Sequence, residues 1–290
     1  MEIQRRKRTL AVHDGAFHAD EITAAALLLL YDMIDIDKIY RTRDQSVIKK
    51  SEYVCDVGGI YDPDIKRFDH HQSQYVGEMS SAGMILLYLK DKKIISPELY
   101  RYFNDALIIG VDADDNGRVK LKRGFCSFSQ AIANFLPVEY DASEEKRDQS
   151  FKNALTFVIG HLKRLQERYY YNERCKVIVK KVMDKSKHFL IFDEAISWMD
   201  SFFALGGEKH SAVFVVMPTQ DHWKLRGIPP SMNKRMKVRI PQPSSWAGLH
   251  EADLKKQSKI DGAIFCHKGL FISIWETKKD AINALKFVLK

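Results

Sequence analysis

The chain has 290 residues, of which 45% are hydrophobic and 29% are charged, as in typical soluble globular proteins. This length favours two domains over one, and the composition excludes a chain that is disordered throughout. Lys and Arg number 46 against 38 Asp and Glu, so the formal charge is +8, a surplus compatible with a polyanionic partner because phosphates are bound largely by Lys and Arg.

The basic run Arg5-Arg6-Lys7-Arg8 leads directly into a strand-like segment, without the apolar core of a secretory signal. We expect residues 1–8 to form a solvated tail, with a nuclear address or a phosphate-binding arm as alternatives. The longest apolar stretch, residues 24–31, falls far short of the roughly 20 residues that span a bilayer. The four cysteines show no CxxC spacing, which favours a reducing compartment. We therefore expect an intracellular, cytoplasmic protein without membrane contact, and we leave open whether it forms a homo-oligomer.

The first 145 residues alternate between strand-like and helix-like segments. Strands are predicted at residues 10–12, 39–41 and 53–57, and helices at residues 21–33, 81–90 and 97–111. Asp20 is suitably placed to cap the first of these helices. Because strands that alternate with helices typically form a parallel sheet, we expect such a sheet with both faces covered.

The second half has a different organisation. Residues 144–185 contain no Pro, one Gly and apolar residues at helical spacing, which predicts one long helix or a kinked pair. Strands are then predicted at residues 188–192, 212–217, 223–228, 263–266 and 271–275, with an extended loop at residues 229–249 and a closing helix at residues 278–289. The predicted fold class is therefore α/β: an N-terminal parallel-sheet domain (1–145), a long helical linker (146–187) and a smaller α+β C-terminal domain (188–290).

Histidine and aspartate gather in four short segments of the first half, at residues 13–21, 55–59, 67–72 and 111–117. Each segment alone has an ordinary interpretation as a helix cap, a turn or a polar surface. Together, four such clusters at the ends of successive elements indicate a shared metal site, because open α/β sheets bind ligands beyond the carboxyl ends of their strands. Mixed imidazole and carboxylate ligands suit Mn²⁺ or Co²⁺ better than Ca²⁺.

These motifs carry a resemblance to known families. Asp69-His70-His71 is similar to the signature triplet of the DHH phosphoesterases, and the order of the four segments follows that superfamily. The chain more closely resembles the melanocyte-proliferating-gene (Myg) exonuclease family. The resemblance is carried by residues 13–21, 61–72, 80–83, 112–117, 223–229, 241–248 and 262–267. It implies a DHH-type catalytic domain and a 3′–5′ exonuclease that hydrolyses RNA.

The resemblance also implies roles for individual residues. It implies a site for two divalent ions, Mn²⁺ in the first place, with Mg²⁺ or Co²⁺ as alternatives. The implied metal ligands are His13, His18, Asp20, Asp56, His70 and Asp112. Asp56 would bridge the two ions, Asp115 is the alternative to Asp112, and His71 would act as general acid or contact a phosphate.

The C-terminal domain offers cations for substrate phosphates. The candidates for substrate binding are Lys224, Arg226, Arg239 and His267, with Lys237 and Lys268 beside them; ordinary surface charge is the alternative for each. The expected substrate is RNA or a short oligonucleotide. Two other functions stay open: hydrolysis of a small phosphate, either pyrophosphate or a cyclic dinucleotide, and nucleic-acid binding with a non-catalytic metal site.

Overall fold

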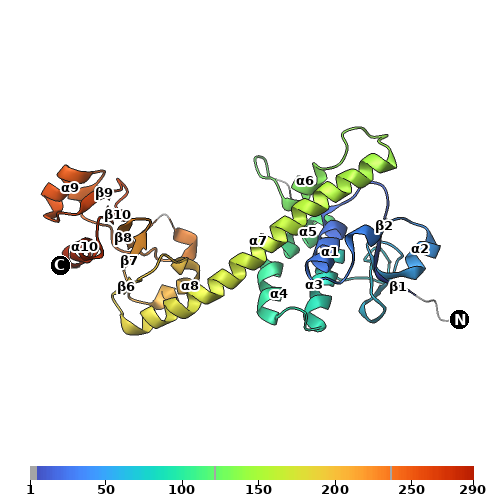
Figure 1. Ribbon diagram of the computed structural model, residues 1–290, viewed down its shortest axis with the longest axis horizontal. Helices are drawn as coiled ribbons and strands as arrows, with labels where there is room; N and C mark the ends of the chain where they lie inside the picture. The colour runs from blue at the N-terminus through green and yellow to red at the C-terminus, as the bar shows by residue number, and fades with distance from the viewer. Residues whose placement is uncertain (1–4, 121, 236) are drawn as a thin grey trace. The chain divides into compact units, whose positions relative to one another are not determined.

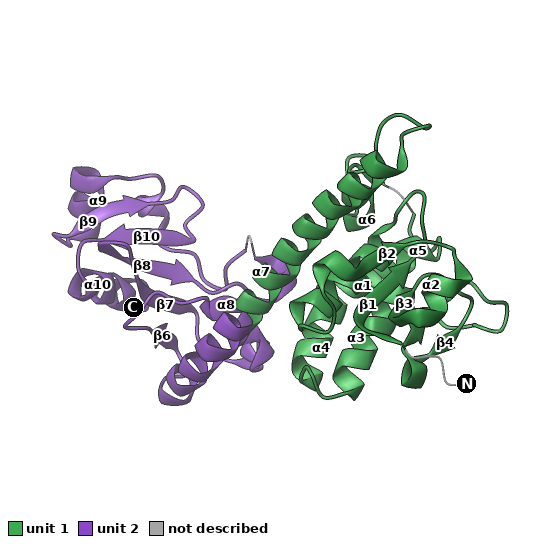
Figure 2. Cartoon of the chain, turned by 45° about the vertical axis from the view of Figure 1, so that its right-hand side comes forward, with its two compact units in different colours: residues 1–169 green, residues 170–290 purple. Residues whose placement is uncertain are grey.

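The computed structural model describes residues 5–120, 122–235 and 237–290. The chain forms two compact units, residues 1–169 and residues 170–290 (Figure 2). Helix α7, Glu144–Lys185, begins in the first unit and ends in the second (Figure 1). Of the two predicted forms of this segment, the single long helix is therefore confirmed.

The first unit is built on a five-stranded sheet in the order β2-β1-β3-β5-β4. Its strands are β1 (Arg6–Val12), β2 (Ile39–Arg41), β3 (Ser51–Cys55), β4 (Tyr61–Asp62) and β5 (Arg67–Phe68). Strands β2, β1, β3 and β5 are parallel, whereas β4 pairs antiparallel with β5 at the edge. The predicted parallel sheet is confirmed with this one mixed edge, so the carboxyl ends of β1, β3 and β5 lie along one side of the sheet.

Helices cover both faces of this sheet. They are α1 (Ala19–Leu30), α2 (Gln45–Lys50), α3 (Ser81–Asp91), α4 (Pro97–Phe103), α5 (Ile109–Asp115) and α6 (Phe128–Ala133), with a π-helix, η3 (Asn104–Ile108), between α4 and α5 and short 3₁₀ turns η1 (Ile36–Lys38) and η2 (Pro63–Ile65). Leu10 and Val12 of β1 face the main core with α1, α3 and the start of α7. Ala11, between them, faces the other side with Ile48 of α2, as the two-residue period of a strand requires.

Strand β1 begins earlier than predicted. It includes Arg6, Lys7 and Arg8, three of the residues expected in a solvated tail; residues 1–4 of that tail lie outside the described residues. The Arg8 guanidinium contacts Asp32 at 2.6 Å and Asp35 at 2.5 Å. Residues 6–8 are therefore part of the sheet, and the charge of Arg8 is paired with two carboxylates.

The second unit contains a sheet in the order β6-β7-β8-β10-β9. Its strands are β6 (Phe189–Ile191), β7 (Phe214–Thr219), β8 (His222–Gly227), β9 (Ala263–Cys266) and β10 (Ile272–Trp275), and its helices are α8 (Trp198–Ala204), α9 (Glu251–Ser258) and α10 (Lys278–Val288). The expected loop at residues 229–249 also holds two 3₁₀ turns, η5 (Met232–Lys234) and η6 (Ser244–Trp246), and a third turn, η4 (Gly207–Lys209), follows α8. Trp246 is fully buried beside Trp275, so this loop contributes to the core of the unit. In the described part of the chain, no helix is long and apolar enough to cross a membrane.

Candidate metal centre

Three strands of the first unit deliver polar side chains to the same edge of the sheet. His13 follows β1, Asp56 follows β3, and the triplet Asp69-His70-His71 follows β5. Asp56 adopts a φ of 56°, in the left-handed region that non-glycine residues rarely occupy. Such a conformation stores about 1 kcal/mol or more of strain and is typical of functional sites. The strained turn places the Asp56 carboxylate between the histidines of the neighbouring strands.

The two oxygens of Asp56 face two different imidazoles. Oδ2 lies 3.2 Å from His13 Nε2, and Oδ1 lies 3.3 Å from His70 Nε2. His13 is further oriented by its Nδ1, which lies 2.7 Å from the carbonyl oxygen of Asp14. If Nδ1 donates its proton to that carbonyl, Nε2 of the neutral ring keeps a lone pair for a metal ion. Asp56 therefore presents one carboxylate oxygen to each of the two imidazoles.

Helices α1 and α5 complete the group around His70. Its Nε2 lies 3.1 Å from Asp115 Oδ2 and 4.0 Å from Asp20 Oδ2. Asp20 lies in the first turn of α1 and is fully buried. The ligand atoms of His18, Asp20 and Asp115 also lie within 4.8 Å of one another. Strand ends and helix ends thus converge on one small volume.

Five buried polar atoms in this volume have no hydrogen-bond partner: Nε2 of His13 and of His70, both carboxylate oxygens of Asp20, and Oδ1 of Asp56. Unpartnered buried polar groups are costly and rare. All five are atoms that can donate a lone pair to a cation, and together they come from imidazoles and carboxylates. The residues therefore fit divalent transition-metal ions such as Mn²⁺.

The charges in this cluster shift the pKa values of its members. Burial, followed by the nearby carboxylates of Glu21, Asp56 and Asp115, raises the pKa of Asp20 well above its usual range. Burial disfavours the charged form of His13 and His70, but the adjacent carboxylates outweigh it and raise both pKa values to about 10. Burial also acts against ionised Asp56, yet the two imidazoles lower its pKa. The raised pKa values of Asp20, His13 and His70 show that negative charge is in excess in this cluster.

The N-terminus of α1 differs from the sequence-based prediction. His18, rather than Asp20, is the N-cap residue, and the backbone N–H of His18 donates to both carboxylate oxygens of Glu21, at 2.9 and 3.0 Å. Glu21 is fully buried and its Oε1 lies 3.3 Å from His13 Nε2. Sequence reasoning assigned no role to Glu21, although a Glu three residues after a cap position is the signature of a capping box.

Asp69 positions the exposed histidine of the triplet. One of its oxygens lies 2.9 Å from His71 Nδ1, and the other accepts a hydrogen bond of 2.6 Å from the backbone N–H of Gly59. The His71 side chain is 64% exposed, in contrast to the buried His70. The ring of His71 is thus oriented by Asp69 and remains open to a ligand.

The structure separates the two candidates for the last carboxylate. Asp112 Oδ1 accepts hydrogen bonds from the backbone N–H groups of Ser80 and Gly83, at 3.0 and 3.1 Å, and from the Ser80 hydroxyl at 2.7 Å. A Cβ on Gly83 would lie 2.2 Å from Asp112 Oδ2. Asp112 therefore holds the N-terminus of α3, and the side chain that meets His70 belongs to Asp115.

A cavity of about 660 Å³ opens beside the cluster. Its lining comes from the metal-centre residues, from the segment after α5 and from α6: Phe17, His18, Ala19, Asp20, His70, His71, Asp114, Asp115, Asn116, Ser129, Gln130, Ala133 and Leu136. This volume lies within the usual range for ligand pockets. The exposed ring of His71 and the buried carboxylate of Asp20 thus share one accessible space.

Three of the four substrate candidates of the second unit lie on its sheet or beside it. Lys224 and Arg226 are two residues apart on β8, so they point to the same face. The Arg226 guanidinium lies 5.8 Å from the ring centroid of Phe271, and the His267 ring lies 4.4 Å from the same ring. Burial lowers the pKa values of Lys224 and Arg226. These side chains form a basic and aromatic group.

Arg239 is engaged differently. Its guanidinium donates to the backbone carbonyls of Pro229, Ala212 and Gly207, at 3.2, 2.7 and 2.6 Å, and also to that of His210. These contacts tie the loop after β8 to the segment before β7. With its donors used in this way, Arg239 stabilises the unit. Lys237 and Lys268 are exposed.

The similarity to a known family covers almost the whole chain and is not limited to the motifs. The family model for MYG1 exonuclease, described as an uncharacterised protein family (UPF0160), matches residues 9–288. The chain belongs to the MYG1 exonuclease family. The resemblance that the motifs of both halves indicated is thereby confirmed over nearly the full length.

Members of the MYG1 family from distant organisms align with almost the entire chain. The MYG1 protein of Chlamydia trachomatis serovar D is 50% identical over 283 residues, which cover 98% of this chain and 97% of that protein. The MYG1 exonuclease of Homo sapiens is 28% identical over 324 residues, covering 97% of this chain and 85% of that protein. Among solved structures, RecJ from Thermus thermophilus in complex with Mn²⁺ aligns with 99% of this chain and 53% of that chain, with a TM-score of 0.30 and 12% identity.

Proposed function

We propose that this chain is a divalent-metal-dependent phosphoesterase that removes nucleotides from the 3′ end of RNA or short oligonucleotides. The observation that carries the proposal is the position of Asp56, whose two oxygens face the imidazoles of His13 and His70 at 3.2 and 3.3 Å. Membership of a family that includes a human protein named MYG1 exonuclease supports the same activity. The RNA preference and the 3′–5′ direction rest on the family resemblance.

The donor atoms divide into two sets that share Asp56. His13 and His18 would hold one ion with Asp56 Oδ2, because their ligand atoms lie within 4.8 Å of one another. Asp20, His70 and Asp115 would hold the other ion with Asp56 Oδ1. Glu21 belongs to the same group of possible ligands. We assign it a positioning role, because its carboxylate accepts the His18 N–H. The proposed ions are Mn²⁺, with Mg²⁺ or Co²⁺ as substitutes.

The chemistry follows from these placements. Two divalent ions, when bound, lower the pKa of water and neutralise charge on the phosphoryl oxygens. The carboxylates and imidazoles of the chain would hold the positive charge of the ions in place, so little reorganisation of the site would accompany the reaction. His71 has its Nδ1 held by Asp69 and its ring exposed at the cavity. It is therefore placed to donate a proton to the leaving oxygen or to bind a phosphate.

The size of the cavity also favours a second candidate function. A volume of about 660 Å³ accommodates a pyrophosphate or a cyclic dinucleotide as well as the end of a polynucleotide. Hydrolysis of a small phosphate would use the same ligands and the same His71. The two functions differ in whether residues outside the cavity contact the substrate.

The test is hydrolysis of a 5′-labelled single-stranded RNA in the presence of Mn²⁺. Wild type is expected to give a ladder that shortens from the 3′ end, and Asp56→Ala and His70→Ala are expected to give none. Lys49→Ala on α2, an exposed residue that does not line the cavity, serves as the control and should match wild type. Intact RNA after incubation with a protein that binds Mn²⁺ would move the assignment to the small-phosphate function. Intact RNA without any Mn²⁺ binding would contradict the metal centre itself.

A further inference from the structure

A strongly basic loop lies between the metal centre and α6. We call residues 116–127 the basic loop; residue 121 is outside the described residues. No acidic residue occurs between Asp115 and Glu139, whereas the loop carries Arg118, Lys120, Lys122 and Arg123. A run of four cations without an acidic neighbour makes a local positive field, which attracts polyanions.

The basic loop is attached to the catalytic cavity at both ends. It starts directly after Asp115, and its first residue, Asn116, lines the cavity. It ends at α6, whose Ser129 and Gln130 line the same cavity. The Ser127 hydroxyl donates a hydrogen bond of 2.7 Å to Asp114 Oδ2, which ties the two ends together. A ligand that extends out of the cavity on this side meets the loop.

The cations of the basic loop divide into one that is paired and three that are not. Arg118 forms an ion pair of 3.0 Å with Glu78 and donates to its backbone carbonyl, so it fixes the loop to the body of the unit. Lys120, Lys122 and Arg123 are exposed, and no carboxylate in the described part of the chain pairs with them. Three charges therefore remain available to a partner.

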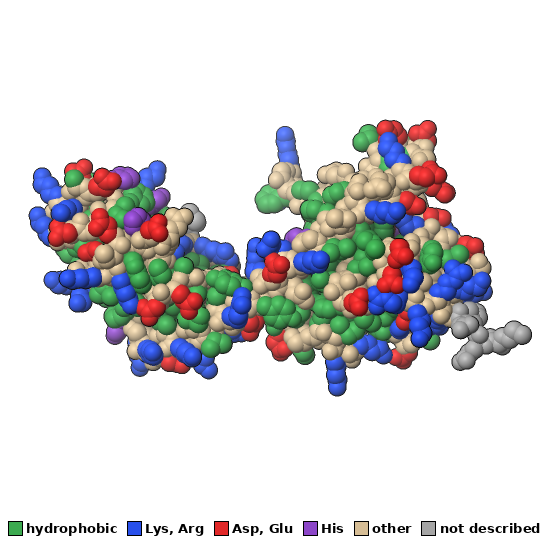
Figure 3. All heavy atoms as spheres, in the orientation of Figure 1, with side chains coloured by type: hydrophobic (Ala, Val, Ile, Leu, Met, Phe, Trp, Pro, Cys, Tyr) green, Lys and Arg blue, Asp and Glu red, His purple; other side chains and the backbone are tan. Residues whose placement is uncertain are grey.

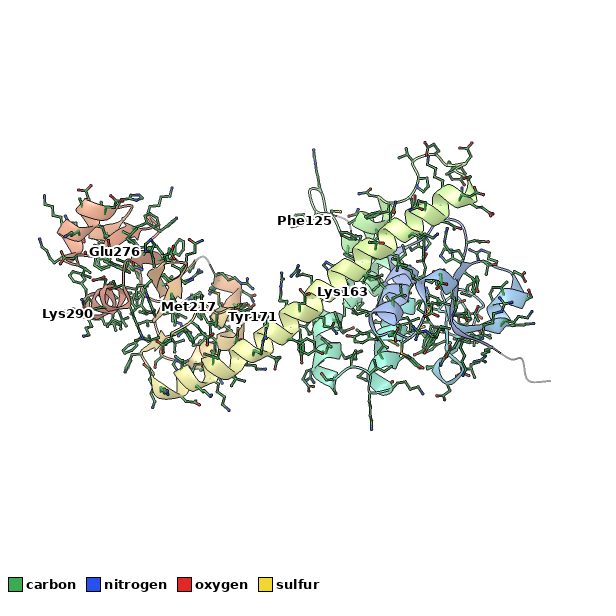
Figure 4. All side chains as sticks on the ribbon, viewed as in Figure 1. Phe125, Lys163, Tyr171, Met217, Glu276 and Lys290 are labelled. Carbon is green, nitrogen blue, oxygen red and sulfur yellow. The ribbon has the colours of Figure 1, made fainter. Side chains whose placement is uncertain are left out.

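The basic loop also exposes an aromatic ring. Phe125 is 67% exposed, and the Lys122 ammonium lies 4.7 Å from the centroid of its ring. Figure 4 labels Phe125 on the loop that extends beside α6, and Figure 3 shows Lys or Arg atoms and hydrophobic atoms together at that place. An exposed aromatic ring beside unpaired cations is the combination with which proteins bind single strands, because bases stack on the ring and phosphates contact the cations.

We propose that the basic loop binds single-stranded nucleic acid next to the metal centre. Lys120, Lys122 and Arg123 contact phosphates of the strand, and Phe125 stacks on one of its bases. This inference rests on the proposed function and specifies its substrate: a strand of several nucleotides, because Lys120, Lys122, Arg123 and Phe125 are not among the residues that line the cavity and only a ligand that extends beyond the cavity contacts them. An unpaired strand is required, since bases in a duplex are stacked on each other and offer no free face to a side chain.

The test separates binding by the loop from hydrolysis in the cavity. A fluorescent ten-nucleotide single-stranded RNA is titrated with the full chain in EDTA, where no hydrolysis occurs, and anisotropy is followed at several NaCl concentrations. The variants are Lys120→Ala/Lys122→Ala/Arg123→Ala and, separately, Phe125→Ala. Lys49→Ala/Lys50→Ala on α2 removes two exposed charges elsewhere on the unit. Thermal unfolding of each variant confirms that it folds.

We expect the triple variant to bind the RNA at least tenfold more weakly than wild type. Its plot of log affinity against log salt should be shallower by about 2, because each phosphate contact to a single strand contributes roughly 0.7 to the slope. Phe125→Ala should weaken binding about fivefold or more without a change of slope, since stacking is not ionic. The α2 control should bind like wild type.

Two results overturn the proposal. In the first, the loop variants bind RNA as tightly as wild type; in the second, the α2 control loses as much affinity for RNA as the loop variants do. Hydrolysis of bis(p-nitrophenyl) phosphate by wild type with Mn²⁺, measured alongside, tests the cavity on a substrate too small for the loop. If wild type hydrolyses this diester while the loop variants bind RNA normally, the inference fails and the proposed function stands. If RNA binding depends on the loop but no phosphodiester is hydrolysed, the proposed function fails and the loop remains a nucleic-acid site.

Discussion

Asp112 and Asp115 lie three residues apart on one helix, and the structure predicts opposite effects when each is replaced by Ala. Asp112→Ala should destabilise the first unit and leave Mn²⁺ binding in place. Asp115→Ala should weaken Mn²⁺ binding and leave stability nearly unchanged. The contrast follows from the contacts of the two carboxylates and not from their position in the sequence.

The magnitude for Asp112 comes from the groups that it would leave without a partner. Its Oδ1 accepts from two backbone N–H groups and one hydroxyl at the start of α3, and both Ser80 and Gly83 are buried. A buried donor that loses its partner costs about 1–3 kcal/mol. With partial relief by water, we expect Asp112→Ala to lower the free energy of unfolding by about 3 kcal/mol. For a unit of this size, that corresponds to a fall in Tm of roughly 6–12 °C.

Asp115 does not hold a helix end in the way that Asp112 does. Its side chain is 15% exposed and contacts the ring of His70, which keeps its contact with Asp56 when Asp115 is removed. Its removal also relieves repulsion among the acidic groups, since its charge contributes to the raised pKa of Asp20. We therefore expect a change in unfolding free energy below about 1 kcal/mol.

The assay is thermal unfolding in EDTA, together with calorimetric titration of Mn²⁺. EDTA is needed because a bound ion stabilises the folded state and would hide the difference. Asp112→Ala should melt early yet bind the wild-type number of ions below its Tm, and Asp115→Ala should melt normally with one ion lost or weakened. An Asp112→Ala protein that melts like wild type and loses an ion would refute the assignment.

Three further predictions rest on the same contacts. In the ion-free protein the pKa values of His13 and His70 are raised to about 10, so below that pH Mn²⁺ must displace protons from the site. The affinity for Mn²⁺ should therefore rise with pH, about tenfold per pH unit for each proton released. Calorimetric titration in buffers of different ionisation enthalpy counts the released protons, and finding none would contradict the shared site. Gly83→Ala places a Cβ 2.2 Å from Asp112 Oδ2 at the start of α3. This overlap should lower the free energy of unfolding by about 1–3 kcal/mol and Tm with it. A variant that melts like wild type would show that the contact is not tight. Cys126 is exposed, whereas Cys266 is fully buried and its burial raises the pKa of the thiol. Because the accessible thiolate is the reactive form, a maleimide at neutral pH should label Cys126 and spare Cys266 in the folded protein, and mass spectrometry showing equal labelling would contradict this.

The fold and the outline of the metal centre could be predicted from the sequence because both depend on local order. A strand followed at once by His13, and another followed by Asp56, places both side chains at the carboxyl edge of a parallel sheet. The apolar spacing of residues 144–185 likewise predicts helix, and of its two possible forms, one long helix or a kinked pair, the structure has the first. Strands β4 and β5 have two residues each, too few for any periodicity to show.

The choice between Asp112 and Asp115 could not be predicted, because it depends on the rotation of a helix. The π-helix η3, Asn104–Ile108, precedes α5 and adds residues per turn, so it changes which face of α5 meets the cluster. The role of Arg239 was hidden for another reason. The carbonyls that it contacts at Gly207 and Ala212 lie 32 and 27 residues away in the sequence, and only the folded loop brings them to the guanidinium.

The most direct test of a two-ion centre bridged by Asp56 is the electron paramagnetic resonance spectrum of the Mn²⁺-loaded chain. Ions that share a carboxylate lie roughly 3.5–4 Å apart, so wild type should give the spectrum of an exchange-coupled pair with two Mn²⁺ per chain. Asp56→Ala should show uncoupled Mn²⁺ or none. A wild-type spectrum of isolated ions, unchanged in Asp56→Ala, would contradict the account.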